Sequence, residues 1–193
     1  MKAKISYTAR YLPERVLSNF DLEKMVDTTD EWIRSRTGIE KRHLVGEGEA
    51  TSDMCTMIAK QLLEKSGKAA EEIDLILIAT STPDYMVVST AALVQDKIGA
   101  INAWGYDIVA ACTGFVYAME TGSKLVESGQ YKNAMVIGAD TMSSIIDYTD
   151  RNTCVIFGDG GGGVLLEPSK DETGILDSIL HVDGSGSKYL TVP

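Results

Sequence analysis

Cysteine is scarce in this sequence, and its spacing excludes the commonest structural roles of the residue. Three cysteines, Cys55, Cys112 and Cys154, occur among 193 residues. An odd number at such wide spacing gives neither a disulfide framework nor the CxxC pattern of a metal site. Each cysteine is therefore treated as a thiol, and no metal is expected.

Basic residues and long apolar runs are also few. Eighteen Lys and Arg against 28 Asp and Glu give a net charge of −10, which argues against a general affinity for nucleic acid or anionic membranes. No apolar run approaches the ~20 residues that a membrane span requires. The N-terminus "MKAKISYTARYLPERV" lacks the apolar core of a signal peptide. We therefore expect a cytoplasmic protein without nucleic-acid or membrane partners.

Segments typical of buried strands alternate with segments of helical character, and no linker or low-complexity tract divides the chain. The runs at 73–80, 103–111 and 133–140 are apolar and β-rich, as expected of neighbouring strands in a mostly parallel sheet. The 44% hydrophobic content is enough for a substantial core. The pattern predicts an α/β layered fold with crossover helices on both faces of the sheet.

Three helices are expected, one before these strands and two between them. One, near 52–65, carries Met54, Met57, Ile58 and Leu62 on one face, so its methionines are assigned to the core, together with Cys55. A second covers 89–100. The third follows Cys112, with apolar residues at helical spacing and a C-terminal stop at Gly129.

The C-terminal quarter combines a glycine run with two further strand-like segments. Residues 163–168 and 174–184 are predicted to pair as antiparallel strands joined through 169–173. The run "GDGGGG" at 158–163 formally satisfies GxGxxG, but a strand-like segment follows it, which argues against a dinucleotide site. We expect a loop whose glycines serve close backbone approach or positive φ.

Cys112 is predicted to lie at the end of a buried strand and in the first turn of a helix. A helix N-terminus favours the thiolate, which is the reactive form of cysteine. The small neighbours Ala110, Ala111 and Gly114 suit a tight turn like the nucleophile elbow of hydrolases. The alternative is a small buried packing residue, the usual role of a free cysteine.

Five motifs together resemble β-ketoacyl-acyl carrier protein synthase III, of the thiolase-like superfamily. They are "DTTDEWIRSRTGIEKRH" at 27–43, "TPDY" at 82–85, "AACTGF" around Cys112, "DRNTCVIFGDGGGGVLL" at 150–166 and "HVDGSG" at 181–186. The resemblance implies a thiolase-like layered fold in a homodimer. It also implies that Cys112 takes an acyl group from acyl-CoA, and that the acyl-enzyme condenses with malonyl-acyl carrier protein to initiate fatty acid synthesis. Coenzyme A enters as part of the substrate, and no separate cofactor is implied.

The resemblance also assigns residues to substrate binding. Trp32 and Arg36 match a pair that contacts the adenine end of coenzyme A, with Thr28 beside them and Arg151 opposite. If the resemblance is set aside, Trp32 is interpreted as an ordinary aromatic residue on a helix face and Arg36 as a solvated charge. Their spacing of four nevertheless places both on one face of a helix.

The acyl pocket is expected to involve Val87 and Phe157. Val87 is a departure from the family, because "MVV" at 86–88 stands where a Pro-aromatic-Pro run is common. The smaller side chain predicts tolerance of longer or branched acyl starters.

The histidine and asparagine that complete the family's site have no match here. His43, expected to be exposed, and His181, in a strand-like run, do not align with them. We expect residues 1–170 to form the nucleophile-bearing N-terminal half and 171–193 to begin the connection to a C-terminal half. Two alternatives remain open: a related condensing enzyme that primes polyketide synthesis, and a non-catalytic subunit for dimerisation or carrier-protein binding.

Overall fold

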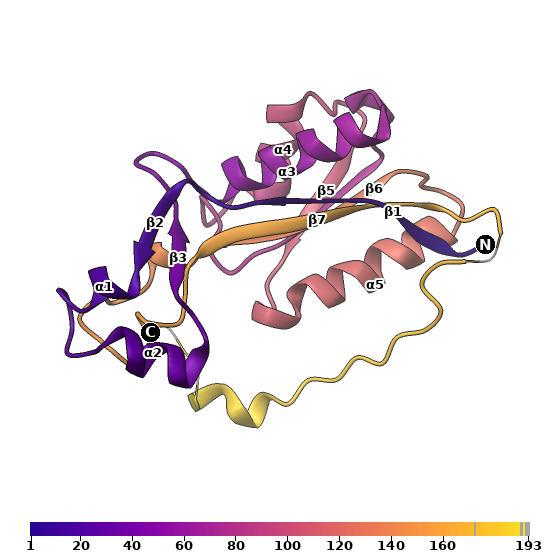
Figure 1. The fold of residues 1–193 in the computed structure, drawn as a ribbon. Helices are drawn as coiled ribbons and strands as arrows, with labels where there is room; N and C mark the ends of the chain where they lie inside the picture. The colour runs from indigo at the N-terminus through magenta and orange to yellow at the C-terminus, as the bar shows by residue number, and fades with distance from the viewer. Residues whose placement is uncertain (172, 190, 192–193) are drawn as a thin grey trace.

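A five-stranded sheet forms the centre of the fold (Figure 1). The computed structural model describes residues 1–171, 173–189 and 191. The strand order is β1-β7-β6-β4-β5; β4 pairs in parallel with β5 and β6, whereas β7 is antiparallel to both β6 and β1. All strands except β7 therefore run in one direction, which confirms the mostly parallel sheet. The strands are β1 (Ala3–Tyr11), β4 (Leu75–Ala79), β5 (Trp104–Ile108), β6 (Ala134–Thr141) and β7 (Asp159–Pro168).

Helices cover both faces of this sheet, as predicted. α3 (Thr51–Ser66) and α4 (Thr90–Ile98) lie on one face and α5 (Gly114–Glu127) on the other (Figure 1). α3 ends at Gly67, whose φ of 67° is the left-handed conformation that glycine adopts without strain. The predicted apolar face of α3 is wrong at one position, because Met57 is 43% exposed whereas Met54, Ile58 and Leu62 are buried.

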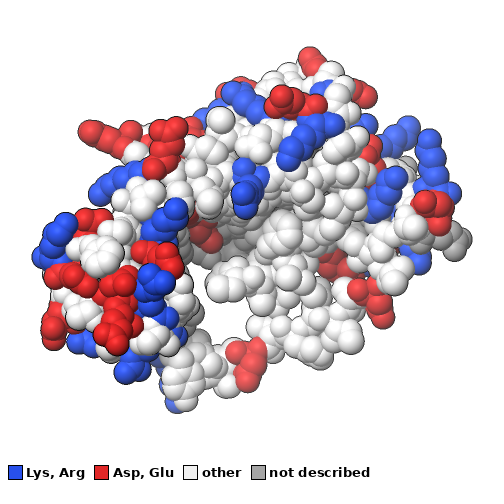
Figure 2. Space-filling model, viewed as in Figure 1, with Lys and Arg blue, Asp and Glu red and all other residues white. Residues whose placement is uncertain are grey.

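A smaller lobe lies at one end of β1 and β7 (Figure 1). It contains a separate two-stranded antiparallel sheet and its own apolar cluster, which includes Ile33 and Cys154. Charged side chains of both signs gather on this lobe (Figure 2). Its elements are β2 (Arg15–Ser18), α1 (Asn19–Leu22), α2 (Asp30–Thr37) and β3 (Lys41–Leu44).

The segment after β7 corrects one prediction. Residues 174–184 do not form a strand; they run past α5 toward the small lobe (Figure 1) and end in the short 3₁₀ segment η4 (Gly184–Tyr189). Both edges of β7 are already paired, with β1 and β6, so no edge remains for a second strand. Three further 3₁₀ turns are η1 (Ala70–Glu72), η2 (Ala111–Thr113) and η3 (Met142–Ser144).

Two statements about the whole chain complete the description. Within the described ranges, no helix has the length and apolar character needed to cross a bilayer. The division of the chain at residue 170 stays a prediction, although β7 ends close to it, at Pro168.

Candidate active site

The thiol of Cys112 is exposed on a tight turn between β5 and α5. Thr113 closes the turn, because its amide and hydroxyl both donate to the carbonyl of Ala110, at 3.2 and 2.8 Å. Ala111 has a φ of 46°, a left-handed conformation that a residue with a side chain rarely adopts. Such strained positions cluster at functional sites, where the surrounding structure holds them. The predicted strand-to-helix position of Cys112 is confirmed, and within this chain the residue is exposed and not part of a core cluster.

The start of α5 supplies the electrostatic part of this site. Thr113 is the N-cap residue, but its side chain makes no capping hydrogen bond to the helix. The first amides of a helix without such a cap retain donor capacity and a partial positive charge. This environment favours a developing oxyanion nearby.

A cavity of about 490 Å³ opens beside Cys112. Small residues dominate its lining, so the backbone of the sheet is accessible from the side of the thiol. Gly138 illustrates the tight packing at this wall, since a Cβ there would lie 3.1 Å from the ring of Phe115. The lining residues are Ala79, Ala111, Cys112, Phe115, Gly138, Ala139, Asp140, Met142, Gly158, Gly160, Gly162 and Gly163.

The glycine run is a strand and not the predicted loop. Gly160–Gly163 belong to β7, between β1 and β6, and none of the four has a positive φ. Close approach is the reason for glycine here: a Cβ on Gly161 would lie 2.6 Å from that of Ala139, and one on Gly163 2.8 Å from Cγ2 of Ile58. The run lies beside the candidate nucleophile, because Gly160, Gly162 and Gly163 line the Cys112 cavity.

Three of the four residues predicted to contact coenzyme A lie together around the indole of Trp32. The guanidinium carbon of Arg36 is 4.8 Å from the ring centroid, and that of Arg151 is 4.7 Å from it. The N-cap hydroxyl of Thr29, which accepts from the Trp32 amide at 3.1 Å, fixes the start of α2. We call Trp32, Arg36 and Arg151 the arginine–tryptophan cluster. An indole between two cations offers an aromatic surface and positive charge, which suit a base and its phosphates.

Thr28 and Asp27 lie at the edge of this cluster. The hydroxyl of Thr28 is buried and finds no hydrogen-bond partner in the described part of the chain. Arg151 makes an ion pair with the exposed Asp27, at 3.5 Å. Arg151 of the cluster is therefore held by the Trp32 ring and by an exposed acid, and the next residue after that acid has a buried hydroxyl without a partner among the described residues.

The two residues predicted for the acyl pocket do not line the Cys112 cavity of this chain. Val87 is 94% exposed on the loop before α4, and Phe157 is half-buried beside Gly158. Their role in an acyl pocket stays a prediction.

The remaining thiols and the histidines lie away from the cavity. Cys55 and Cys154 are buried, as expected of core residues, and burial raises the pKa of both thiols. His43 is half-buried, not exposed as predicted, with its Nδ1 2.6 Å from the carbonyl oxygen of Pro13. His181 is exposed and not in a strand; its carbonyl accepts from the hydroxyl of Tyr117 at 2.8 Å.

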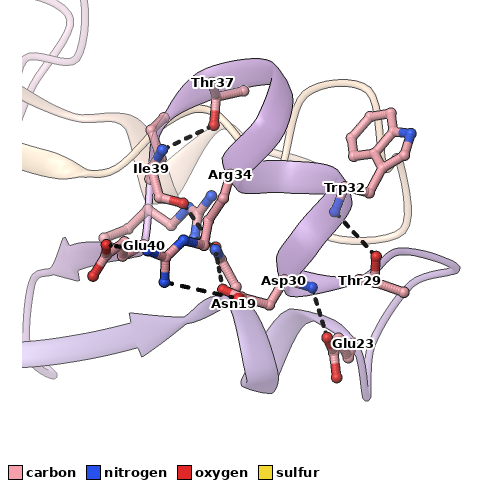
Figure 3. Close-up of polar contacts among 10 residues, drawn as sticks. Asn19, Glu23, Thr29, Asp30, Trp32, Arg34, Thr37, Ile39 and Glu40 are labelled. Carbon is pink, nitrogen blue, oxygen red and sulfur yellow. Dashed lines mark hydrogen bonds and ion pairs between the residues drawn. The ribbon is translucent and has the colours of Figure 1, made fainter.

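Sequence reasoning missed two buried polar residues of the small lobe, Asn19 and Arg42. Asn19 is 0% and Arg42 3% exposed, and the two side chains are hydrogen-bonded to each other. Neither carries a local signal of burial, because Asn19 follows a typical cap residue and Arg42 lies between two other basic residues. In Figure 3, Asn19 lies beside Asp30 at the start of α2, and Trp32 points away from it.

Comparisons with known proteins agree with this geometry. A family model described as 3-oxoacyl-[acyl-carrier-protein (ACP)] synthase III matches residues 106–184. A curated β-ketoacyl-[acyl-carrier-protein] synthase III from Chlorobium luteolum is 60% identical over 190 residues, covering 97% of this chain and 58% of the relative. A solved structure of 3-oxoacyl-[acyl-carrier-protein] synthase III from Aquifex aeolicus has a TM-score of 0.92 at 46% identity, covering 95% of this chain and 59% of that one.

A second type of condensing enzyme is also similar. The priming β-ketosynthase of the R1128 polyketide biosynthetic pathway has a TM-score of 0.90 at 31% identity, over 95% of this chain and 55% of that one. The chain spans less than two thirds of the full length of the curated relative from Chlorobium luteolum and of both solved structures.

Proposed function

This chain belongs to the β-ketoacyl-acyl carrier protein synthase III family, and from this premise we propose that it carries the nucleophile of a condensing acyltransferase. The Cys112 thiolate attacks the carbonyl carbon of an acyl-CoA, and the coenzyme A thiolate leaves. Malonyl-acyl carrier protein then loses carbon dioxide, and the resulting enolate carbon attacks the acyl-cysteine. The new carbon–carbon bond gives β-ketoacyl-acyl carrier protein, and Cys112 leaves as a thiolate.

One observation carries this proposal: among the chain's three thiols, Cys112 alone is exposed, and it lines a cavity of small residues at the start of a helix. A thiol suits the reaction because exchange between two thioesters is nearly balanced, so the acyl-enzyme remains reactive. The amide of Cys112 is a candidate donor to the oxyanion that forms during acyl transfer, because the amides of Thr113 and Gly114 already donate to the carbonyls of Ala110 and Ala111.

The second half-reaction needs donors that stabilise the enolate charge of the decarboxylated malonyl group. Neither His43 nor His181 lines the Cys112 cavity. We assign this task to a histidine and an asparagine in the part of the family sequence that the chain does not span. The arginine–tryptophan cluster and Thr28 are assigned to the nucleotide end of acyl-CoA, with Val87 and Phe157 bordering the acyl pocket. The protein is proposed to act as a cytoplasmic homodimer.

Acyl transfer to Cys112 tests the proposal directly. The protein is incubated with acetyl-CoA, and the acetyl group is located by peptide mass spectrometry. We expect one acetyl group on Cys112 and none in Cys112→Ala, whose fold is checked by circular dichroism. An acetyl group on Cys55 or Cys154 would contradict the assignment, and no acylation of the folded protein would favour the non-catalytic subunit.

A polyketide-priming synthase is the second candidate, favoured by the similarity to the R1128 priming enzyme. The two candidates share the acyl-cysteine and differ in starter and acceptor. Comparing kcat/KM for malonyl groups on the carrier proteins of fatty acid and of polyketide synthesis distinguishes them, because Val87 predicts tolerance of longer starters in either case.

A further inference from the structure

The arginine–tryptophan cluster is built from two segments that are far apart in the sequence. Trp32 and Arg36 lie on α2, whereas Arg151 lies in a series of turns between η3 and β7. Arg151 approaches the indole to 4.7 Å. Since a site for a planar base depends on the spacing of its walls, something must fix the two segments relative to each other.

Arg42 makes the polar connection to the segment of Arg151. From β3, its guanidinium donates through Nε, at 3.2 Å, and through Nη2 to the carbonyl of Val155. Val155 and Arg151 belong to the same turns: the Cys154 amide donates to the Asp150 carbonyl at 3.0 Å, and the Thr153 hydroxyl to the Asp150 carboxylate at 2.9 Å. Holding the Val155 carbonyl therefore constrains the backbone that carries Arg151.

Asn19 extends the connection to both ends of α2. Its Oδ1 accepts from Nη1 of Arg42, and its Nδ2 donates to Oδ1 of Asp30 and to the carbonyl of Ile39, each at 2.8 Å. Asp30 is the first residue of α2, and Ile39 follows the glycine that ends it. Asn19 thus holds the start and the exit of the helix that presents Trp32 and Arg36 (Figure 3).

The chemistry of these hydrogen bonds indicates that Arg42 and Asn19 fix the positions of the segments they join and do not serve mainly to stabilise the fold. Both acceptors of Arg42 are neutral, and burial lowers the pKa of its guanidinium. Burying a charge without an opposite charge costs free energy, and an apolar residue of similar volume often stabilises a protein as well or better. A planar guanidinium, however, reaches two segments at once in a fixed geometry.

We propose that Asn19 and Arg42 are positioning residues for the nucleotide end of acyl-CoA: they set the distance between α2 and the turns that carry Arg151. The inference rests on the function proposed above. It predicts that losing the connection weakens binding of the nucleotide without affecting the chemistry at Cys112.

The test compares Arg42→Met and Asn19→Ser with wild type, and uses Lys41→Met as a matched control. Lys41 is an exposed cation next to Arg42 on β3. Arg42→Met keeps the volume of the core while removing the charge, and Asn19→Ser replaces the amide that makes the hydrogen bonds with a shorter hydroxyl side chain. Circular dichroism and thermal melting establish that each variant is folded.

Two measurements are made on each folded variant. Calorimetry gives the Kd for adenosine 3′,5′-bisphosphate, the nucleotide portion of coenzyme A. Kinetics of Cys112 acylation are then compared for acetyl-CoA and for S-acetyl-N-acetylcysteamine, a donor without the nucleotide. For both variants we expect the Kd and the KM for acetyl-CoA to rise roughly tenfold. The kcat for acetyl-CoA and the kinetics with the short donor should stay within about twofold of wild type. Lys41→Met should behave as wild type.

Two results would overturn the inference. One is a wild-type Kd and KM in both folded variants. The other is an equal loss of rate with both donors, which indicates a general structural role. Failure of the proposed function is distinguishable, because wild-type protein would then neither bind the bisphosphate nor be acylated by acetyl-CoA. If the wild type binds the bisphosphate and is acylated by acetyl-CoA, and both variants behave in the same way, only the positioning role is excluded.

Discussion

Three thiols of one chain occupy very different surroundings, and their reactivity should differ accordingly. Cys112 is exposed, whereas Cys55 and Cys154 are buried, and burial raises the pKa of both buried thiols. Near neutral pH, iodoacetamide should therefore modify Cys112 at least roughly tenfold faster than either other cysteine in the folded protein. Peptide mass spectrometry at increasing times gives the three rates.

A pH series sharpens this prediction. Because burial keeps Cys55 and Cys154 protonated and shielded, neither of these two thiols should be modified as the pH is raised until the protein unfolds. A denatured sample, in which all three thiols react, is the control. Modification of Cys55 or Cys154 before Cys112 would show that the exposed thiol is not the reactive one.

The residues around Cys112 also show what a sequence reveals at this scale. A cysteine between an apolar β-rich run and a helical pattern was enough to predict its position. The left-handed backbone of Ala111 was not predictable, because alanine carries no signal for a positive φ, and only the surrounding structure imposes it. The buried pair of Asn19 and Arg42 was missed for a similar reason, since its hydrogen bonds join residues 23 positions apart.

At the level of elements, β7 depends on glycine at alternate positions. Gly161→Ala and Gly163→Ala should each lower the free energy of unfolding by about 1–3 kcal/mol, because the new Cβ overlaps Ala139 or Ile58. Gly162→Ala is the matched control in the same strand: its Cβ would meet only the Ala9 carbonyl, at 3.6 Å. Urea unfolding measures all three. Equal effects at positions 161, 162 and 163 would mean that close approach is not the reason for these glycines.

The start of α1 makes a prediction about pH. The hydroxyl and then the amide of Ser18 donate to the Asp21 carboxylate, which lowers the pKa of Asp21 from 3.8 to about 2. A lowered pKa stabilises the folded state above the unfolded-state value, and this contribution is lost as the pH falls through the folded-state value. Asp21→Asn should therefore be less stable than wild type above about pH 4. Their free energies of unfolding should converge as the pH falls toward about 2. A difference between the two proteins that does not change with pH would contradict this role of the carboxylate.

Elements were predicted where the pattern is strong and local. Buried parallel strands give continuous apolar runs, and the helices α3, α4 and α5 give helical spacing with glycine at their ends, so both kinds were found from sequence. The prediction of a strand at 174–184 was wrong because pairing depends on a free strand edge, and β7 has none. The prediction of a loop for the glycine run is wrong because the need for close packing in β7 arises from α3 and β6, which are remote in sequence.

At the scale of the whole molecule, the loop before α4 presents apolar side chains to the outside. Met86 is 99% and Val87 94% exposed, and neither lines the Cys112 cavity of its own chain. In the proposed homodimer, Val87 would border the acyl pocket of the partner. A larger side chain there should shorten the acyl group that the partner accepts.

Val87→Phe should therefore lower kcat/KM for a six-carbon acyl-CoA by roughly tenfold relative to that for acetyl-CoA. Val87→Leu, which adds little volume, is the control and should accept most of the acyl-CoA starters that the wild type accepts. The same relative kcat/KM values in Val87→Phe and wild type would exclude Val87 as a determinant of the starter.

A mixed dimer shows whether the effect crosses between subunits. A chain with both Val87→Phe and Cys112→Ala cannot be acylated itself, so in a mixture with wild-type chains the only working thiols belong to wild type. If Val87 acts on its partner, the wild-type thiols in mixed dimers should show the narrowed range of starters, in proportion to the fraction of mixed dimers. If Val87 acts within its own chain, those thiols should keep the full range, and the pocket would have to be assigned to one subunit alone.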